Sequence, residues 1–401
     1  MITPMARCFV CYYHEILLKK GNRGFFERIL WNNTQKALQG IPYRALRKLP
    51  GRLIVELLPE SPVDEIGVCL QKVIGLIYCC PAWVSSQDIG QMGQDLWGLV
   101  RDRKFETFKI QARRANKEFP LPSPEINACL GDVIRESSGK LVRLKNPDLT
   151  CYVDIVDQDA FLYFEKLRGQ GGLPVSSSGK VVVLISGGID SPVAAYKVLK
   201  RGCRAIFVHF HSLPYTTLES LEKVRQLVSI LNEYQYQSKI YMIPFAELQR
   251  QIVAFTPTAT RVILYRRMMV RLAELVARRE RAQALVTGDS IGQVASQTLE
   301  NLRATSDACQ LPVLRPLIGE DKEEIINIAR RIETFKISIL PDVDCCSLFV
   351  PRHPETRAKV EKIHQIENEL DVPQMIREAW QKREIEKLFS RDAVEVNSNR
   401  S

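Results

Sequence analysis

The second half of the chain alternates short apolar runs with helical segments, and this rhythm constrains the fold more than any other feature. Four runs fit buried strands, and they lie at residues 181–185, 205–210, 239–243 and 284–286. Strands that read as continuous apolar runs, each followed by a helix, are typical of a parallel sheet covered on both faces. We therefore predict an α/β fold with a doubly wound parallel sheet.

The first of these strands leads directly into the loop Ser186-Gly187-Gly188-Ile189-Asp190-Ser191, after which Pro192 opens a helix. Glycines let the backbone approach an anion, and serine hydroxyls and helix N-terminal amides supply donors. The GK[ST] ending of a Walker loop is absent, which argues against a kinase or GTPase. We predict that the loop holds a β,γ-pyrophosphate as a leaving group while the α-phosphate is attacked; the alternative is a turn that only caps the helix.

Length and charge bound the remaining possibilities. A chain of 401 residues exceeds what one core usually holds, so we expect two or three domains. Lys and Arg number 56 against 46 Asp and Glu, an excess of ten that favours a polyanionic partner. The eleven cysteines are dispersed and follow no secretory signal, and the apolar runs are far shorter than the ~20 residues of a membrane helix. We expect a protein of the reducing cytoplasm that does not enter the membrane.

The first half of the chain has a different organisation. Residues 1–75 alternate apolar and polar positions around a helix at 25–38, and residues 76–168 continue as a mixture of strands and a helix at 123–136. Segment 169–180 is rich in Gly and Ser, so we interpret it as a linker. The parallel-sheet domain would then occupy residues 181–395.

Basic residues are concentrated in segment 101–117, which holds only two acidic side chains. Its basic residues are Arg101, Arg103, Lys104, Lys109, Arg113, Arg114 and Lys117. Charge alone leaves two interpretations open, a solvated surface or a surface that contacts phosphates.

Five stretches of the second half resemble a known family. SGGIDSPVAAY at 186–196 resembles the PP-loop motif of ATP pyrophosphatases, and four further stretches resemble the tRNA 4-thiouridine synthetases (ThiI, a tRNA sulfurtransferase). These are VHFHSLPYT at 208–216, YRRMM at 265–269, TGDSIGQVASQTLENL at 287–302 and DCCSLF at 344–349.

The first half resembles the same family. FKIQARRANKEFPLPSPEIN at 108–127, NPDL at 146–149 and GQGGLPV at 169–175 resemble its THUMP domain and the exit from it, and HEILLKKGNRGFFERIL at 14–30 resembles its ferredoxin-like domain. The resemblance implies a ferredoxin-like domain at 1–75, a THUMP RNA-binding domain at 76–168 and a PP-loop ATP pyrophosphatase domain at 181–395.

The resemblance also implies the site residues. ATP would be bound by the loop and by positions that follow other strands, with Mg²⁺ on its phosphates. The expected residues are Leu184, Ile185, Ser186, Gly187, Gly188, Asp190, Ser191, His209, Phe210, Arg266, Gly288 and Gln297. Asp190 and Cys345 would be catalytic, and Arg113, Arg114 and Lys117 would bind RNA.

Cys345 is the residue that matches the family's persulfide-bearing thiol. A bridge from Cys345 to Cys346 would be strained, because neighbouring Cα atoms lie ~3.8 Å apart, below the usual disulfide range of ~4.4 to 6.8 Å. We therefore assign no resolving role to Cys346. Only a short segment follows the PP-loop domain, so we expect no rhodanese domain, and sulfur would pass from a cysteine desulfurase straight to Cys345.

The activity that the resemblance implies is that of a tRNA uracil 4-sulfurtransferase, which forms 4-thiouridine at tRNA position 8 through adenylation of uridine O4. It also implies a homodimer and an additional role in making the thiazole of thiamin. Two alternatives stay open: a PP-loop tRNA-modifying synthetase that uses ammonia or an amine, and a tRNA-binding protein without catalytic activity.

Overall fold

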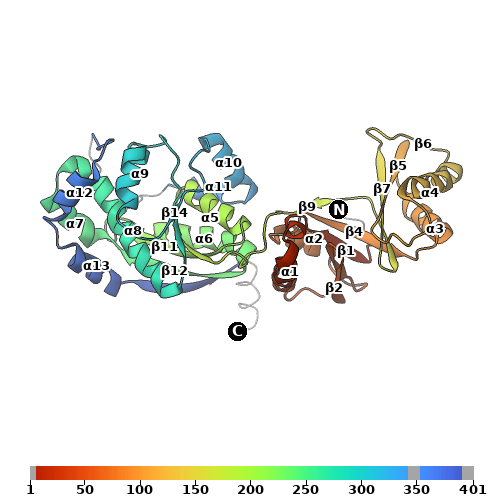
Figure 1. Cartoon of the computed structure of the whole chain (residues 1–401), viewed down its shortest axis with the longest axis horizontal. Helices are drawn as coiled ribbons and strands as arrows, with labels where there is room; N and C mark the ends of the chain where they lie inside the picture. Colours follow the sequence, from red (N-terminus) through yellow and green to blue (C-terminus); the bar gives the residue numbers. More distant parts are fainter. Residues whose placement is uncertain (1–5, 342–352, 391–401) are drawn as a thin grey trace. The chain divides into compact units, whose positions relative to one another are not determined.

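The computed structural model describes residues 6–341 and 353–390, and the chain divides into two compact units, Met1–Pro174 and Val175–Ser401 (Figure 1). Each unit has its own sheet and its own hydrophobic cores. No helix of the described residues is long and apolar enough to cross a membrane.

Unit 1 is built on one sheet with the order β2-β3-β1-β4-β8-β7-β5-β6, and β9 also pairs with β4. Its strands are β1 (Cys8–Tyr12), β2 (Ala45–Leu49), β3 (Arg52–Glu56), β4 (Tyr78–Ser85), β5 (Thr107–Arg114), β6 (Leu141–Val142), β7 (Leu149–Val156), β8 (Asp159–Tyr163) and β9 (Leu167–Arg168). Its α-helices are α1 (Arg23–Ala37), α2 (Val63–Lys72), α3 (Ile89–Val100) and α4 (Ser123–Ser138).

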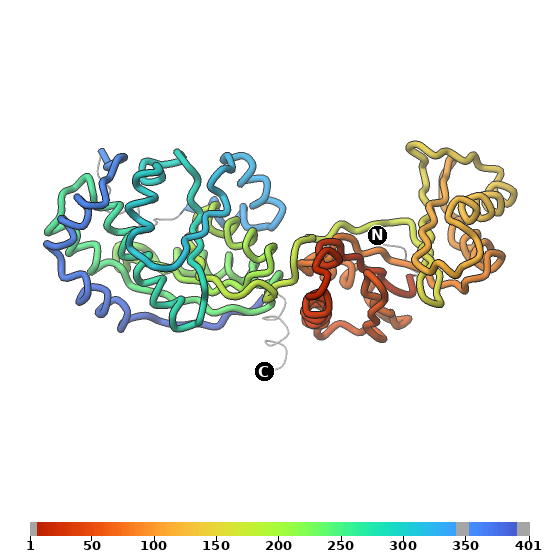
Figure 2. The backbone as a smooth tube through the Cα atoms, viewed as in Figure 1, coloured from red at the N-terminus to blue at the C-terminus, as the bar shows by residue number. Residues whose placement is uncertain are grey.

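Two helix pairs cover different ends of this sheet and form separate cores. Leu30 of α1 and Leu70 of α2 pack with Phe9 of β1, whereas α3 and α4 pack on β5 and β7 around Phe108. Figure 2 shows the chain leaving the first part along β4, and β8, which runs antiparallel to β4, leads it back. The sheet is continuous because β8 pairs with β4. The division of residues 1–168 into two domains at 75/76 stays a prediction.

Unit 2 is built on a second sheet with the order β14-β13-β10-β11-β12-β15. Its strands are β10 (Lys180–Leu184), β11 (Arg204–His211), β12 (Gln237–Pro244), β13 (Ala284–Val286), β14 (Val313–Leu314) and β15 (Glu384–Phe389). Its α-helices are α5 (Asp190–Lys200), α6 (Leu218–Gln235), α7 (Ala246–Phe255), α8 (Arg261–Glu280), α9 (Leu299–Ser306), α10 (Lys322–Arg331), α11 (Phe335–Ser338), α12 (Val360–Glu367) and α13 (Val372–Gln381).

Helices lie on both faces of this sheet, as predicted. Val182 and Val208 belong to the core that includes α7 and α8. Since side chains alternate along a strand, the buried Val181 and Val183 face the other side, where α5 and α6 pack on β11. The four predicted strands of this half are confirmed as β10, β11, β12 and β13, and they pair in parallel.

The C-terminal segment adds a strand that the sequence did not predict. After α13 the chain forms β15, which pairs antiparallel with β12 at the edge of the sheet. The sheet is therefore parallel except at this edge. The sequence does not predict β15, because its six residues mix charged side chains with Ile385, Leu388 and Phe389. Such a short mixed pattern also fits an exposed loop.

Candidate nucleotide-binding site

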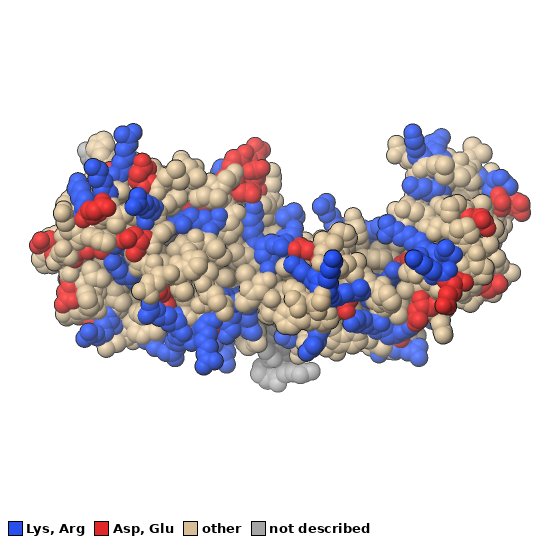
Figure 3. Space-filling view, in the orientation of Figure 1, with Lys and Arg blue, Asp and Glu red and all other residues tan. Residues whose placement is uncertain are grey.

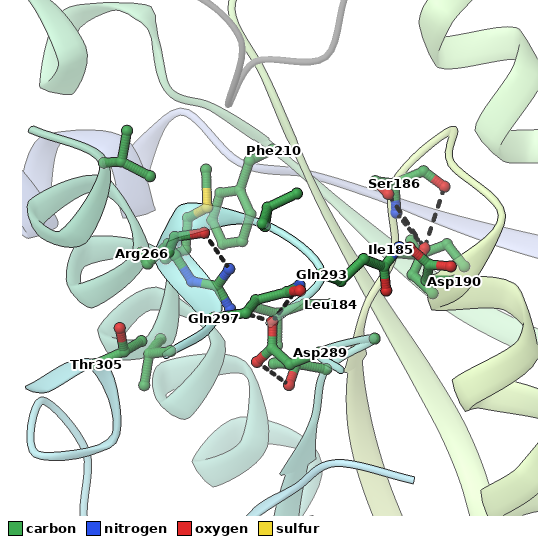
Figure 4. Close-up of a pocket in the computed structure, with 18 of the residues that line it drawn as sticks. Leu184, Ile185, Ser186, Asp190, Phe210, Arg266, Asp289, Gln293, Gln297 and Thr305 are labelled. Carbon is green, nitrogen blue, oxygen red and sulfur yellow. Dashed lines mark hydrogen bonds and ion pairs between the residues drawn. The ribbon is translucent and has the colours of Figure 1, made fainter. Parts of the chain in front are cut away.

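A cavity of about 510 Å³ lies at the carboxyl ends of β10, β11 and β13. This is where open parallel sheets bind ligands. It is lined by every residue predicted to bind ATP except Gly187 and Gly188, namely Leu184, Ile185, Ser186, Asp190, Ser191, His209, Phe210, Arg266, Gly288 and Gln297. These predicted residues, which are spread over about 110 positions of the sequence, therefore share one cavity. Figure 4 shows many of them.

The loop after β10 is held by hydrogen bonds between its own residues. The Ser186 amide donates to Ser191 Oγ at 2.9 Å, and the two serine hydroxyl oxygens lie 3.2 Å apart. Ser338 Oγ of α11 donates to the Gly188 carbonyl at 3.2 Å. The helix α5 begins at Asp190, so its first free amides face the loop. The loop is preorganised to receive an anion.

Gly288 allows a second loop to touch the first. A Cβ atom built at Gly288 would lie 2.8 Å from the Ser191 nitrogen and 2.9 Å from the Asp190 carbonyl carbon. Real Cβ atoms do not approach backbone so closely, so only glycine fits here. At Gly188, in contrast, a Cβ would make an ordinary contact at 3.5 Å with Ser186 Oγ, so the chain itself does not require that glycine.

Asp190 is the acidic side chain of the loop, and it has two partners that the sequence did not reveal. Lys322 Nζ of α10 lies 2.6 Å from Asp190 Oδ1, and Gln293 Nε2 donates to Asp190 Oδ2 at 3.0 Å. Lys322 is 45% exposed and Asp190 24% exposed. The carboxylate is therefore accessible from the cavity and faces a cation that a phosphate could also contact.

Asp289 is a buried carboxylate that fixes the opposite wall, and it too was missed from sequence. Its Oδ1 accepts hydrogen bonds from Arg266 and Gln297, and its Oδ2 accepts from Thr287 at 2.7 Å and from Arg315 at 3.2 Å. Burial alone would raise the pKa of Asp289, but the charge and hydrogen bond of Arg266 outweigh it and lower that pKa below its usual value. Arg266 is thus oriented by an ionised acid (Figure 4).

His209 and Phe210 end β11 on the third side of the cavity. His209 is buried, and its Nδ1 lies 2.9 Å from the Ile185 carbonyl, which ties β11 to the start of the loop. The Phe210 ring packs against Phe245 with ring centroids 5.5 Å apart. Together with Val262, Met269 and Val270, Phe210 makes this part of the cavity apolar.

A second cavity, of about 790 Å³, lies within unit 1. Arg113 and Arg114 line it together with Arg52 and Lys166, whereas the exposed Lys117 does not. The aromatic residues that line it are Tyr12, Tyr13, Tyr78 and Tyr163.

Only some of these basic groups are free to meet a ligand. Arg52 is buried and paired with Asp154, and Arg114 Nη1 donates to the Phe119 carbonyl at 2.6 Å. Burial lowers the pKa of Lys166, whose ammonium lies 3.7 Å from the centre of the Tyr152 ring. Figure 3 shows further Lys and Arg side chains exposed on this unit, interspersed with Asp and Glu.

The predicted catalytic thiol, Cys345, and its neighbour Cys346 lie outside the described residues. Within residues 6–341 and 353–390, no group of three or more His, Cys, Asp or Glu side chains is placed to hold a metal ion. The nine cysteines of the described part are free thiols, and burial raises the pKa of Cys151 to about 12.

Family models match the chain in three segments. They are described as "Thiamine biosynthesis protein (ThiI)" at residues 176–372, "THUMP domain" at 89–165 and "ThiI ferredoxin-like domain" at 8–80. The chain is 43% identical over 373 residues to a probable tRNA sulfurtransferase of Thermus thermophilus, with 93% of this chain and 92% of that protein covered. A probable tRNA sulfurtransferase of Moorella thermoacetica is 42% identical, with 93% and 95% covered.

The fold is also that of a solved structure. A crystal structure described as a 4-thiouridine synthetase–RNA complex with bound ATP matches with a TM-score of 0.86 and 34% identity, and it covers 96% of this chain and 100% of that one. The similarity to these relatives extends over both units rather than over unit 2 alone. This chain therefore belongs to the tRNA sulfurtransferase family.

Proposed function

We propose that this protein is an ATP-dependent tRNA uracil 4-sulfurtransferase that forms 4-thiouridine at position 8 of tRNA. The observation that supports this most directly is the cavity at the end of β10, where the Ser-Gly-Gly loop, Arg266, Gly288 and Gln297 come together. The similar 4-thiouridine synthetase was crystallised with RNA and ATP. This agrees with the proposal of a nucleotide site in unit 2 and of RNA binding by unit 1.

ATP would lie with its β,γ-pyrophosphate on residues 186–191. The loop amides, the hydroxyls of Ser186 and Ser191 and the ammonium of Lys322 offer hydrogen-bond donors and positive charge to that group. Arg266 would stabilise charge on the α-phosphate, since its guanidinium is held at the cavity wall by Asp289. These groups favour loss of pyrophosphate and thus attack at the α-phosphate.

The residues present fit a magnesium ion that arrives with ATP. Mg²⁺ typically takes one or two carboxylates and completes its shell with water and phosphate oxygens, and Asp190 is the accessible carboxylate beside the loop. Mg²⁺ bound there would neutralise triphosphate charge. Asp190 would then exchange Gln293 or Lys322 for the metal.

The chemistry of the proposed reaction has two stages. Uridine O4 attacks the α-phosphorus, pyrophosphate leaves, and the oxygen becomes part of an AMP leaving group. The terminal sulfur of a Cys345 persulfide then attacks C4 and AMP departs. Alternatively, a thiol reductant is oxidised to its disulfide while it releases that sulfur as sulfide, and the sulfide attacks C4 with departure of AMP. In the direct route, a second thiol cleaves the S–S bond, and the resulting protein disulfide is reduced by an external thiol.

RNA would be bound by unit 1. Arg113 lines the 790 Å³ cavity beside four tyrosines, a combination that suits phosphates and unstacked bases. Arg114 and Lys117 would add charge at or near its rim. The proposed partners are therefore tRNA and a cysteine desulfurase that loads Cys345, and we further propose a cytoplasmic homodimer. A role in thiamin synthesis, which the name of the matching family model suggests, is a separate hypothesis.

Reconstitution tests the proposal. The protein is incubated with unmodified tRNA, ATP, Mg²⁺, cysteine and a desulfurase, and nucleosides are analysed by mass spectrometry. We expect 4-thiouridine with one AMP and one pyrophosphate released per sulfur inserted. Asp190→Asn should give no product, whereas Asp102→Asn, which changes an aspartate 88% exposed in unit 1, should match the unaltered protein.

Other outcomes identify the alternatives. Cytidine at the target position, formed when ammonium replaces the desulfurase and cysteine, would indicate a synthetase that uses an amine nucleophile. Tight tRNA binding with no release of pyrophosphate from ATP would indicate a tRNA-binding protein without catalytic activity. Either outcome, in the absence of 4-thiouridine, would refute the sulfurtransferase assignment.

A further inference from the structure

Two lysines face each other across the antiparallel strands β12 and β15. Lys387 lies directly opposite Lys239, so the two side chains share one face of the sheet. Like charges in such a pair destabilise a sheet. Lys239 is bonded to Glu280 at 2.8 Å, but the exposed Lys387 has no ion pair among residues 6–341 and 353–390. Folding alone would favour an acidic side chain at position 387, so a lysine there is better explained by an anion outside the chain.

The face that carries the two lysines is partly open to solvent. On the opposite face, Glu386 accepts hydrogen bonds from the covering helix α6. On the lysine face, Trp380 of α13 stacks on Tyr241 with ring centroids 6.4 Å apart, but the ladder extends beyond this contact. There Phe389, which lies on the same face as Lys387, is 40% exposed. An exposed aromatic ring thus accompanies the lysines.

Further cations lie beside this face at the end of α8. Arg279 and Arg281 are exposed, whereas the side chain of Glu280 between them is 11% exposed and already bonded to Lys239. A helix C-terminus accounts for part of this charge, since cations stabilise its dipole, but it does not account for Lys387. Figure 3 shows Lys and Arg side chains gathered along the lower border of unit 2, where Figure 1 labels β12. The surface is therefore positively charged.

We name five residues the basic sheet face: Lys239, Lys387, Phe389, Arg279 and Arg281. It combines what binds RNA without reading its sequence, namely cations for phosphates and an exposed ring on which a base stacks. Lys387 and Phe389 are two residues apart on an extended strand, about 7 Å, so a base on the ring would leave its phosphate within reach of the ammonium. An acidic protein would satisfy the cations but would leave the exposed ring unexplained.

The course of the chain favours RNA as the occupant of this face. Lys180 begins β10, and its Nζ donates to the Glu280 carbonyl at 3.1 Å. The segment that links unit 1 to unit 2 therefore ends beside the basic sheet face. An RNA held by a tethered unit is present at a high effective concentration near the point of attachment.

We propose that the basic sheet face is a second RNA-binding surface, in which Lys387, Arg279 and Arg281 contact phosphates and Phe389 stacks on an unpaired base. This rests on the proposed function, which supplies tRNA as the RNA. The face lies at the amino end of β12, at the edge of the sheet opposite to the nucleotide cavity. It would therefore hold a part of the tRNA other than the reacting uridine.

Lys387→Glu separates RNA binding from folding. Opposite charges then face each other across the strands, so urea titration should give a free energy of unfolding at least equal to that of the unaltered protein. tRNA binding should weaken: the salt slope should fall by roughly 0.7 to 0.9 for one lost phosphate contact, which amounts to about five- to eightfold in affinity between 1 M and 0.1 M salt. Lys362→Glu, the same change at an exposed lysine of α12, is the matched control.

Phe389→Leu tests the stacking contact, because it keeps an apolar side chain but removes the ring. tRNA binding should weaken about fivefold or more, without a change in the salt slope. Heparin, a polyanion without bases, should bind Phe389→Leu like the unaltered protein but should bind Lys387→Glu more weakly.

The results separate this inference from the proposed function. If Lys387→Glu binds tRNA like the Lys362→Glu control, or if Phe389→Leu retains full tRNA affinity, the proposal is wrong. A changed oligomeric state or changed sulfur loading by the desulfurase, at unchanged tRNA affinity, would mean that a protein covers this face and would also refute it. If both variants behave as expected while the unaltered protein forms no 4-thiouridine, the proposed function fails and the RNA-binding surface stands.

Discussion

Glu367 should carry a large share of the stability of unit 2, because it closes a buried ion cluster. Its two oxygens accept from Arg267 Nε and Nη2, each at 2.9 Å, and from Arg271 at 2.6 and 2.8 Å. Arg267 is 1% exposed and Glu367 8% exposed. The cluster joins α12 to α8, the helix that also carries Arg266.

The magnitude follows from the pKa of Glu367. Burial alone would raise this pKa, but the hydrogen bonds from Arg271 and Arg267 lower it from 4.5 to about 2. A shift of this size corresponds to roughly 3 kcal/mol at 1.36 kcal/mol per unit. Breaking a buried pair by removing one partner costs a similar amount, about 3 to 5 kcal/mol. We therefore expect Glu367→Gln to lower the free energy of unfolding by about 3 kcal/mol at pH 7.

The pH dependence has a defined sign. The folded pKa is depressed, so the stabilisation is complete above the unfolded pKa of 4.5 and is lost as pH falls toward about 2. The difference in the free energy of unfolding between the unaltered protein and Glu367→Gln should thus disappear as the pH falls from 4.5 to about 2.

Urea titrations followed by tryptophan fluorescence measure this gap, since Trp380 of α13 reports on unit 2. Glu361→Gln changes an exposed glutamate of the same helix and is the matched control. Single substitutions usually change the free energy of unfolding by about 1 kcal/mol. If the free energies of unfolding of Glu367→Gln and the control differ by no more than this at pH 7, the reasoning is refuted.

Three further predictions concern function. Asp190→Ala should abolish release of pyrophosphate from ATP in the presence of tRNA while leaving tRNA affinity unchanged; full turnover at saturating ATP would contradict the PP-loop assignment. Replacing Arg113 and Arg114 by Ala should weaken tRNA binding and reduce its log–log salt slope by roughly 0.7 to 0.9 for each lost phosphate contact, measured by filter binding, and an unchanged slope would mean that this surface is only solvated. Cys345→Ser should stop 4-thiouridine formation but not adenylation, whereas Cys346→Ser should keep part of the activity; persulfide mapped to Cys346 with Cys345 unmodified would count against this assignment.

The sheet of unit 2 could be predicted because its strands are buried on both faces and read as apolar runs between helices. The central strand β4 of unit 1 could not, because Pro81 interrupts it and prolines are rare in central strands. The structure gives the reason why Pro81 is tolerated. On one side β4 pairs with β1. On the other side β9 pairs only with Tyr78 and Cys79, and the pairing of β4 with β8 starts at Ala82. Pro81 falls in this gap, where no ladder bond to β8 or β9 is needed.

Which residues line the cavity could be predicted as far as the motif matches reached. The residues that line the cavity come from loops that follow parallel strands, and the ends of such strands meet at one edge of a sheet. The partners of these residues were not predictable in the same way. Lys322 is 132 positions from Asp190, on a helix that starts with a capping box at Asp321, and nothing in that local pattern indicates a contact with the loop. Long-range ion pairs depend on how the helices pack, which periodicity does not encode.

Two aspartates of the cavity show why burial decides roles that a motif leaves undefined. Asp289 receives four donors from the protein, which fill the acceptor sites of its carboxylate, and it is 3% exposed. It can orient Arg266 but has no capacity left for a ligand. Asp190 receives two donors, one of them from the exposed Lys322, so it can exchange either donor without leaving a buried charge unpaired. Both residues follow a glycine-containing turn after a parallel strand, yet only Asp190 is placed to change partners when a nucleotide and its metal enter.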